Sequence, residues 1–291
     1  MSFAVTAPRS EWRALLILGR VSNLPTVWSN CLAAWLLGDG GPPLRFALLC
    51  FGATCLYVGG MFLNDAFDAD FDRQHRRERP IPAGAITPQK VWSWGVGWLV
   101  LGCISLMPLG KVTAILTLIL IGCILLYDAV HKMISFSPVL MAACRFFLYL
   151  AAGSTSAAGV IGLTLWSAIA VAAYVVGLSY LARRESLPGV LKCWPCYLLG
   201  VPILLAFIVN DGGYRVRGLL LSAILGIWVV RCLRHTFGGP TRNIGATVSG
   251  LLAGIVLVDL LAVADASPQT ITMFLLLFAS ALLFQRHVPA T

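Results

Sequence analysis

Acidic side chains are scarce in this sequence: Asp and Glu total 12 among 291 residues, against 21 Lys and Arg. Charged residues of both signs make up only 11%, whereas a soluble domain averages roughly 25%. Hydrophobic residues reach 59%, and the mean hydropathy is +0.87. This composition excludes an ordinary soluble globular domain and predicts a polytopic membrane protein.

Disulfide and zinc-ligand patterns are also missing. The nine cysteines lie mostly in apolar segments, without secreted-type spacing, and we interpret them as small buried hydrophobic residues. Cys193 and Cys196 have redox-type spacing but no partner pair, while His75 and His131 lack a second ligand at zinc spacing. The formal net charge of +9 belongs mostly to loops facing lipid headgroups, so no nucleic-acid partner is expected.

Ten segments have the length of about 20 apolar residues that a bilayer crossing requires. We place them near 14–37, 44–66, 90–108, 111–129, 138–159, 163–183, 192–210, 215–233, 243–264 and 269–285. The last two are the least certain, because Pro268 and a short gap could make them a re-entrant pair; ten spans fit the charges best, since nine would put Arg286 outside. The prediction is therefore one all-α transmembrane domain over residues 1–291, with nine to ten spans.

Basic residues gather in alternate loops. One side holds Arg9, Arg13, Arg73, Arg76, Arg77, Arg79, Lys90, Lys132, Arg183, Arg184, Lys192, Arg231, Arg234, Arg242 and Arg286, and the other only Arg45, Lys111, Arg215 and Arg217. Because positive loops stay in the cytoplasm, the even-numbered loops and both termini are expected there.

Four of the 12 acidic residues fall within nine consecutive positions, directly after an apolar stretch. Carboxylates at the end of a membrane-length helix are costly to desolvate and are usually functional. On a helix Asp65, Asp68 and Asp72 share one face, Asn64 lies beside Asp68, and Asp70 points elsewhere. Three carboxylates and an amide oxygen make a hard-oxygen site for Mg²⁺, which in such sites commonly bridges to phosphate.

A basic segment punctuated by Pro and Gly follows, from Arg73 to Gly84. Arginine side chains can bind diphosphate oxygens and neutralise the part of the diphosphate's negative charge that a metal ion does not. The acid cluster and the basic segment in series therefore predict a metal–diphosphate clamp. A solvated loop that obeys the positive-inside rule is the alternative.

These residues resemble the UbiA superfamily of intramembrane aromatic prenyltransferases. The family's first signature, N-D-x-x-D-x-x-x-D, is matched without a gap by Asn64, Asp65, Asp68 and Asp72, and Arg79 opens a run similar to the R-P-[IL]-x-x-G that follows. The likeness extends to Arg20, Asn23, Pro25, Thr26 and Asn30 in a polar stripe and to the Tyr127–Lys132 segment. The branch that the chain looks most like is the Ebo-type bacterial one, on the residues Tyr127, Asp128, His131, Lys132, Cys144 and Arg145 and the Tyr-Leu-Ala-Arg run at 180–183.

The resemblance implies a helical bundle around a central cavity, with residues 67–89 forming a cytoplasmic cap. It implies that Mg²⁺ at the first motif binds an isoprenyl diphosphate, whose ionisation releases diphosphate and leaves a carbocation for an acceptor to attack. Such a protein would lie among the lipids of a bacterial inner membrane, with its site facing the cytoplasm. The acceptor and the oligomeric state stay undefined. A non-catalytic prenyl-lipid binder and a transporter with intramembrane carboxylates remain alternatives.

One departure from the family pattern concerns the second acid motif, D-x-x-x-D, near the end of the sixth span. Arg183 and Arg184 stand there instead, and only Glu185 is acidic. The two arginines are expected to grip diphosphate in place of a second metal, with Glu185 as a remaining metal ligand. A site that binds but does not convert its ligand is the alternative.

Other polar residues in or near the spans complete the predicted site. Arg145 lies about two turns inside the fifth span and is expected to contact diphosphate or acceptor, with snorkelling as the alternative. Asp128 and Lys132 are predicted to bind metal or diphosphate, or in Asp128's case to act as a base, although their i, i+4 spacing also fits a simple ion pair. Arg20, Asn30 and Tyr127 are assigned to substrate, and Asp65, Asp68, Asp72, Lys132 and Arg145 to catalysis. Asp259, in the ninth span, is expected to form hydrogen bonds between helices.

Overall fold

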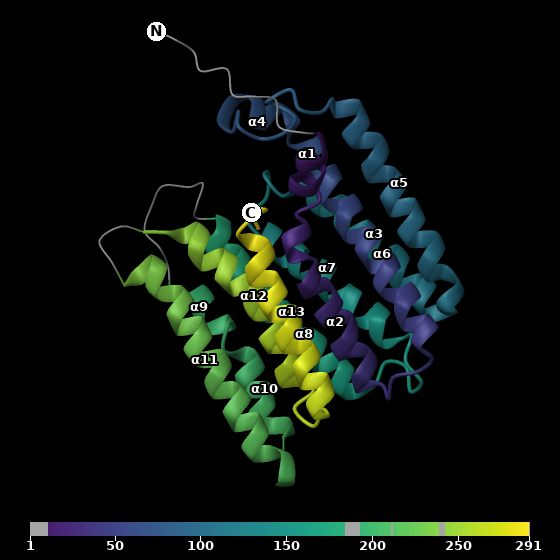
Figure 1. Ribbon diagram of the computed structural model, residues 1–291, viewed down its shortest axis with the longest axis vertical. Coiled ribbons are helices and arrows are strands. Elements are labelled where there is room, and N and C mark those ends of the chain that lie inside the picture. The colour runs from purple at the N-terminus through teal and green to yellow at the C-terminus, as the bar shows by residue number, and fades with distance from the viewer. Residues whose placement is uncertain (1–10, 184–192, 211, 239–241, 291) are drawn as a thin grey trace.

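A computed structural model of the chain describes residues 11–183, 193–210, 212–238 and 242–290 (Figure 1). Helices account for the regular structure of these residues, which contain no strand, so the all-α prediction is confirmed. The helices are α1 (Glu11–Leu18), α2 (Leu24–Leu37), α3 (Pro43–Phe67), α4 (Ala69–His75), α5 (Pro88–Leu106), α6 (Lys111–Val130), α7 (Ser137–Gly153), α8 (Gly162–Arg183), α9 (Trp194–Leu198), α10 (Val201–Val209), α11 (Arg215–Phe237), α12 (Ile244–Ala262) and α13 (Pro268–Gln285), with 3₁₀ turns η1 (Val21–Asn23), η2 (Met107–Leu109) and η3 (Gly212–Tyr214).

Seven helical stretches in the described part of the chain are long and apolar enough to cross a membrane. They contain α3, α5, α6, α8, α11, α12 and α13, whereas the stretches Ser137–Gly153 and Trp194–Val209 are apolar but shorter. The predicted nine to ten spans are therefore matched only roughly. Large apolar side chains such as Ile104, Ile227 and Leu276 are more than 60% exposed, as expected for surfaces that face lipid.

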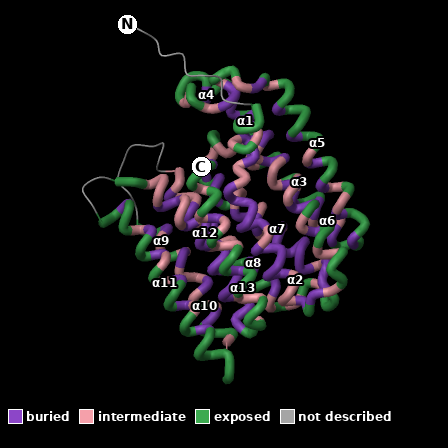
Figure 2. The backbone as a smooth tube through the Cα atoms, in the orientation of Figure 1, coloured by how far each residue is buried: buried purple, intermediate pink, exposed green. Residues whose placement is uncertain are grey.

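Burial is concentrated in the middle of the bundle (Figure 2). In α12, 67% of the most apolar 18 residues are buried, whereas in α13 only 11% are. The core joins α2, α7, α8 and α12 through side chains such as Val27, Tyr149, Tyr174 and Val256. Of these helices, α7, α8 and α12 also line the large cavity described below, together with α3 and α6.

Helix starts and breaks follow local sequence signals. Proline occupies the first turn of α3, α5, α7 and α13, where its missing N–H costs nothing. Thr87 and Ser267 cap α5 and α13 by accepting hydrogen bonds from backbone N–H groups of their first turns. Between α1 and α2, Arg20 has a left-handed backbone with φ of 41°, so the predicted first span is broken there.

The segment from Phe67 to Gln89 is folded rather than extended. It forms α4, which lies over one end of the bundle (Figure 1), followed by hydrogen-bonded turns such as Ala83 N–H to Arg79 O at 2.9 Å. Ile81 and Ile86 are buried in a small cluster with Leu18 and Phe62. This apolar contact holds the basic segment against the ends of α1 and α3.

Helices α3 and α5 pack along a seam of glycines. Gly52 on α3 faces Gly102 on α5, and Gly59 faces Gly95. Within each helix the two glycines are seven residues apart and therefore lie on the same face. A Cβ at Gly59 would lie 2.9 Å from Gly95 O and 2.9 Å from Leu99 N. Both atoms belong to backbone, so they cannot move aside without separating the helices.

Gly59→Ala is therefore expected to lower the stability of the bundle by about 1–3 kcal/mol, the usual range for overpacking. The matched control is Gly97→Ala on α5, where an added Cβ would meet nothing within 4 Å. That control should leave stability unchanged or raise it by up to about 1 kcal/mol, because alanine favours helix. Thermal unfolding in detergent measures both changes. Equal midpoints for the two variants would contradict the close packing.

Candidate functional site

A cavity of about 480 Å³ opens into the bundle beneath α4 and lies within the size range of ligand sites. Its charged end is lined by Arg20, Asn64, Asp68, Asp72, Arg76, Arg79, Asp128, His131, Lys132 and Arg183. Its deeper walls are apolar and include Ala53, Leu56, Leu120, Ile124, Leu148, Val175, Leu178, Leu252 and Ile255. The cavity therefore offers a polar head site and an apolar body in series.

Arg79 joins two of the motif carboxylates. Its Nη1 donates to Asp65 Oδ1 at 3.2 Å and to Asp72 Oδ2 at 2.9 Å, and the three side chains are 16%, 7% and 3% exposed. Arg20 reaches the same place from the break before α2, with Nη2 3.3 Å from Asn64 Oδ1 and 3.5 Å from Asp65 Oδ1. The left-handed turn at Arg20 thus brings a second cation to this end of α3.

Asp68 has a different set of partners, at the end of α6. Lys132 Nζ lies 2.7 Å from Asp68 Oδ1 and 3.7 Å from the centroid of the Phe71 ring, and His131 Nε2 lies 3.4 Å from Asp68 Oδ2. Burial acts to raise the pKa of Asp68, but hydrogen bonds with His131 and Lys132 outweigh it and hold the pKa below its ordinary value. The Asp128–Lys132 ion pair considered from spacing does not form, because Lys132 pairs with Asp68.

Asn64 connects the motif to α6. Its Nδ2 donates to Asp128 Oδ1 at 3.1 Å, in a buried contact between residues 64 positions apart. The second oxygen of Asp128 and Oδ1 of Asp72 are both buried without a hydrogen-bond partner among the described residues. Buried carboxylate oxygens without partners are costly, so a ligand that binds them would relieve a strain already present.

These oxygens also test whether the residues fit the Mg²⁺ expected from sequence. Within residues 11–183 and the other described ranges, no group of three or more Asp, Glu, His or Cys is arranged to hold a metal ion as the side chains stand. Arg79 and Lys132 occupy oxygens of Asp65, Asp68 and Asp72. Carboxylate and amide oxygens are the ligands that Mg²⁺ prefers, so these residues fit the metal once Arg79 and Lys132 leave the carboxylate oxygens.

The arginines that replace the second acid motif are placed only in part. Arg183 lines the cavity, but its Nη1 donates to Ile134 O at 2.6 Å and Ser137 Oγ at 3.2 Å, tying α8 to the loop between α6 and α7. Arg184 and Glu185 lie outside the described residues. The proposed grip of Arg183 on diphosphate would therefore compete with these two hydrogen bonds.

Two residues assigned to substrate differ in their access to the cavity. Tyr127 lines it and stacks on His131, with ring centroids 5.0 Å apart. Asn30 is fully buried between Arg145 and Asp259, and it does not line the cavity. Asp259 accepts hydrogen bonds from α2, so the expected contact between helices forms.

The sequence reasoning missed several side chains at the charged end. His131 contacts Asp68, Tyr57 and Phe71 present aromatic rings, and Arg76 lines the same wall. Arg76 lies within the basic segment from Arg73 to Gly84, and His131 lies within the Tyr127–Lys132 segment. Their places in these two segments are a signal that could have indicated them. Tyr57, in α3, carries no such signal, because an aromatic residue in a membrane span usually serves packing. Phe71 lies in α4 between Asp70 and Asp72, where its residue type alone predicts no role.

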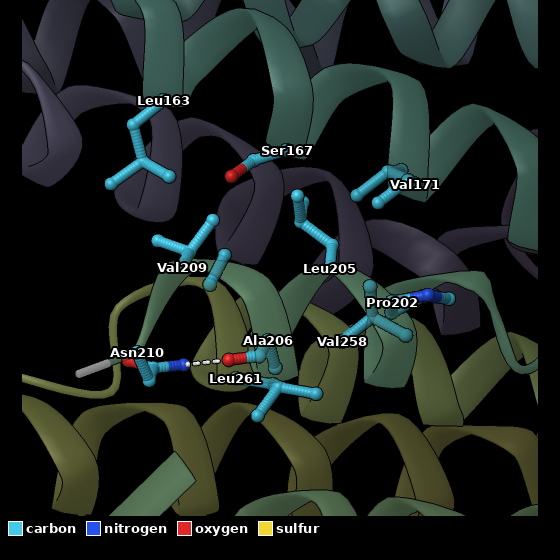
Figure 3. A pocket seen from close by; sticks show the side chains of 12 residues that line it. Leu163, Ser167, Val171, Pro202, Leu205, Ala206, Val209, Asn210, Val258 and Leu261 are labelled. Carbon is cyan, nitrogen blue, oxygen red and sulfur yellow. Dashed lines mark hydrogen bonds between the residues drawn. The ribbon is translucent and has the colours of Figure 1, made fainter. Parts of the chain in front are cut away.

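A second, smaller pocket lies between α8, α10 and α12 (Figure 3). Leu163, Val171, Leu205 and Val258 give it apolar walls, and its volume of about 20 Å³ suits about one water molecule. The Asn210 amide at its edge donates to Ala206 O at 3.0 Å. It is too small for a substrate.

The chain resembles known proteins over most of its length. A family model described as the UbiA prenyltransferase family matches residues 23–289. A 4-hydroxybenzoate octaprenyltransferase from Ralstonia nicotianae is 31% identical over 125 residues, 42% of this chain and 37% of that protein. A digeranylgeranylglyceryl phosphate synthase from Pyrococcus horikoshii is 35% identical over 92 residues, 28% of this chain and 32% of that protein. These matches thus span about a third of the curated relatives' length.

Solved structures share the fold. The apo structure of a UbiA homolog from Aeropyrum pernix K1 has a TM-score of 0.67 at 15% identity, with 86% of this chain and 98% of that chain covered. A UbiA homolog from Archaeoglobus fulgidus bound to DMAPP and Mg²⁺ has a TM-score of 0.53 at 14% identity, with 93% and 98% covered. At such identities the likeness concerns the fold alone.

The apolar helices and the cavity with one charged end define an integral membrane protein of the polytopic helical class. Because the family model matches nearly the whole chain, the protein belongs to the UbiA prenyltransferase family.

Replacing Arg79 tests the charge balance of the site. Arg79→Gln leaves Asp65 and Asp72 buried without their shared cation, which is expected to destabilise the protein by up to about 3–5 kcal/mol. The control Arg73→Gln breaks the pair with Asp70, whose side chains are 55% and 89% exposed, and should cost at most about 1 kcal/mol. Thermal unfolding with and without Mg²⁺ measures both.

Mg²⁺ should raise the midpoint of Arg79→Gln more than that of the wild type, because the metal no longer competes with Arg79 for carboxylates. Equal Mg²⁺ shifts in the two proteins would contradict the overlap of the two cation sites.

Proposed function

We propose that the protein transfers an isoprenyl group from an allylic prenyl diphosphate to an acceptor within the membrane, with Mg²⁺ as cofactor. The observation that carries this proposal is a single cavity whose charged end lies at the family motif and whose remaining walls are apolar. Family membership supports it, as do fold neighbours bound to DMAPP or GPP and Mg²⁺. The relatives' names describe prenyl transfer to 4-hydroxybenzoate and formation of a glyceryl phosphate lipid.

Asn64, Asp65, Asp68 and Asp72 are the proposed metal ligands, with Asp128 beside them. Support comes from the partnerless oxygens of Asp72 and Asp128 and from the Asn64–Asp128 hydrogen bond. Glu185 stays a sequence-based proposal. Mg²⁺, when bound, would offset the charge of the diphosphate and so improve it as a leaving group.

The cations that hold the carboxylates would then change partners. Arg79, Arg20 and Lys132 each use N–H groups on acids in this structure, and all three line the cavity. Once positive charge reaches the carboxylates, these side chains can turn to diphosphate oxygens, where charge-assisted hydrogen bonds stabilise the leaving group. Arg183 and Arg184 are proposed to add to this grip.

The allylic C–O bond breaks with its electron pair going to diphosphate, and the acceptor then forms a bond to the carbon while losing a proton. Tyr57, Phe71 and Tyr127 line the cavity and can stabilise the allylic cation through their ring faces. The apolar walls below them exclude water, which would otherwise trap the cation. The segment 67–89 is proposed to cap this site, because α4 lies directly over it.

The distribution of basic loops supports a cytoplasmic site in a bacterial inner membrane. The charged end lies at the ends of α3, α6 and α8, beside loops rich in arginine. A second candidate, a non-catalytic prenyl-lipid binder, is favoured by one observation: Arg183 is engaged with Ile134 and Ser137 instead of being free for diphosphate.

Asp68→Asn is expected to reduce pyrophosphate release from allylic diphosphates by about 100-fold or more, since a charged group in the head site is lost. Asp70→Asn is the matched control: Asp70 is two residues away, 89% exposed and paired only with Arg73 in the described structure. It should change release by less than about twofold. The assay uses purified protein in nanodiscs with Mg²⁺, diphosphates of graded chain length and a lysate that supplies acceptors.

Chelation of Mg²⁺ should abolish the wild-type signal. Mg²⁺-dependent binding without any release would instead support the non-catalytic binder, and the absence of both would exclude the proposed function.

Lys132→Gln should weaken Mg²⁺-dependent binding of an allylic diphosphate about tenfold, the scale of one hydrogen bond to a charged group. Lys90→Gln is the control, because Lys90 pairs with Glu11 at the surface, where both side chains are about 60% exposed. Isothermal titration with a non-hydrolysable analogue measures the affinities. If Lys132→Gln binds as tightly as Lys90→Gln, Lys132 has no role in diphosphate binding.

A further inference from the structure

A buried guanidinium lies deeper in the cavity than the charged end. Arg145 is 9% exposed and lines the cavity, eight residues into α7 and so about 12 Å along its axis from Ser137. The other arginines lining the cavity, Arg20, Arg76, Arg79 and Arg183, are all at the charged end among the residues described. An arginine within a membrane bundle is costly, and so its position needs an explanation.

The guanidinium is fixed from one side by α2. Its Nη1 donates to Thr26 O at 3.1 Å and to Asn30 Oδ1 at 2.9 Å, and its Nη2 donates to Thr26 Oγ1 at 2.9 Å. Thr26 lies six residues after Arg20, which reaches the acid cluster. The Arg145 side chain is buried and bonded to α2, so it does not snorkel to the membrane surface.

A carboxylate stands behind this contact without touching the arginine. Asn30 Nδ2 donates to Asp259 Oδ1 at 2.9 Å and Oδ2 at 2.8 Å, and Ser29 Oγ donates to Oδ2 at 2.5 Å. All four side chains are buried, and together they join α2, α7 and α12. Asn30 is thus oriented by Asp259 so that its carbonyl oxygen faces Arg145.

This arrangement differs from a simple buried ion pair. An amide separates Arg145 from Asp259, so no described carboxylate neutralises the guanidinium directly. Of its five N–H donors, three hydrogen bonds to described residues are formed, which leaves donors for a ligand in the cavity. Arg145 Cζ lies 5.8 Å from the centroid of the Tyr57 ring, which also lines the cavity, and apolar lining residues such as Leu148 stand nearby on α7.

We propose that Arg145 binds an acidic group, a carboxylate or a phosphate, on the acceptor, and that Asn30 and Asp259 position it. This inference rests on the proposed function. A planar guanidinium in a low-dielectric wall matches a carboxylate or phosphate fork. The acceptor would place its acidic group at Arg145 and its nucleophile toward the charged end, where the allylic carbon lies. A neutral acceptor could accept hydrogen bonds from Arg145 but would supply no negative charge to balance the guanidinium.

The proposed role of Arg145 is tested by measuring how tightly paired probes bind. The protein is held in nanodiscs and saturated with Mg²⁺ and a non-hydrolysable allylic diphosphate. The carboxylate pair is 4-hydroxybenzoate and its methyl ester. The phosphate pair is a glycerol ether-lipid monophosphate and its dephosphorylated alcohol. In at least one pair the acid should bind at least about tenfold more tightly than its neutral partner, the scale of a charged hydrogen bond. The pair that responds identifies the acidic group.

Arg145→Met should remove this preference, and Arg145→Lys should restore part of it. Asn30→Leu, which breaks the contact to Asp259, should weaken binding of the acid probe and leave binding of the neutral probe unchanged. Arg45→Met is the matched control, because Arg45 donates to Leu109 O at the opposite end of α3 and does not line the cavity. Circular dichroism and thermal unfolding establish that each variant is folded.

Diphosphate affinity, measured separately, distinguishes the two proposals. If wild type binds diphosphate with Mg²⁺ but prefers neither acid probe, the role of Arg145 is wrong and the proposed function stands. If Arg145→Met loses diphosphate and acid binding equally, Arg145 serves the diphosphate or the fold, and the inference is also overturned. Loss of Mg²⁺-dependent diphosphate binding in the wild type would refute the proposed function itself.

Discussion

Pairing of a few buried carboxylates with basic side chains organises the charged end of this protein. Asp65, Asp68 and Asp72 are each buried, and a buried charge without a partner is unstable in a low-dielectric bundle. Arg79 and Lys132 supply the compensating charge from the segment after α4 and from the end of α6. These pairs therefore fix where α3, α4 and α6 meet and give the cavity its polar mouth.

The fold class followed from composition and from the length of the apolar runs, because segments of about 20 apolar residues satisfy their backbone hydrogen bonds in a bilayer as helices. Span boundaries were less accessible. Arg20 breaks the first predicted span through a left-handed backbone that no propensity indicates, since arginine favours helix. The contacts that hold α7 and α10 in place are tertiary, so a sequence window of fixed length describes these shorter helices poorly.

The candidate site was predictable in its residue types and less so in its pairings. The spacing of Asp65, Asp68 and Asp72 indicated a shared face, yet the chain breaks at Asp68, which turns to α6 while the other two share Arg79. The alternative pairing of Lys132 with Asp128 was reasonable from i, i+4 spacing, but spacing cannot weigh it against a carboxylate from another helix. The partners of Asp259 could not be predicted for the same reason, because Ser29 and Asn30 lie about 230 residues away in the sequence.

The exchange of partners proposed for Arg79 and Lys132 also bears on the missing second acid motif. A site with two metal ions needs acids enough to balance both, and acids are scarce here. Arg79 and Lys132, which are paired with the carboxylates, can supply positive charge to the diphosphate without a second metal, provided that one divalent ion takes their place on the carboxylates. On this view the acid cluster holds the diphosphate-binding cations in place before substrate arrives, and Asn64 and Asp128 add neutral and partnerless oxygens for the ion. Arginine at positions 183 and 184 is then consistent with the chemistry, since a guanidinium also binds phosphate oxygens through charge-assisted hydrogen bonds.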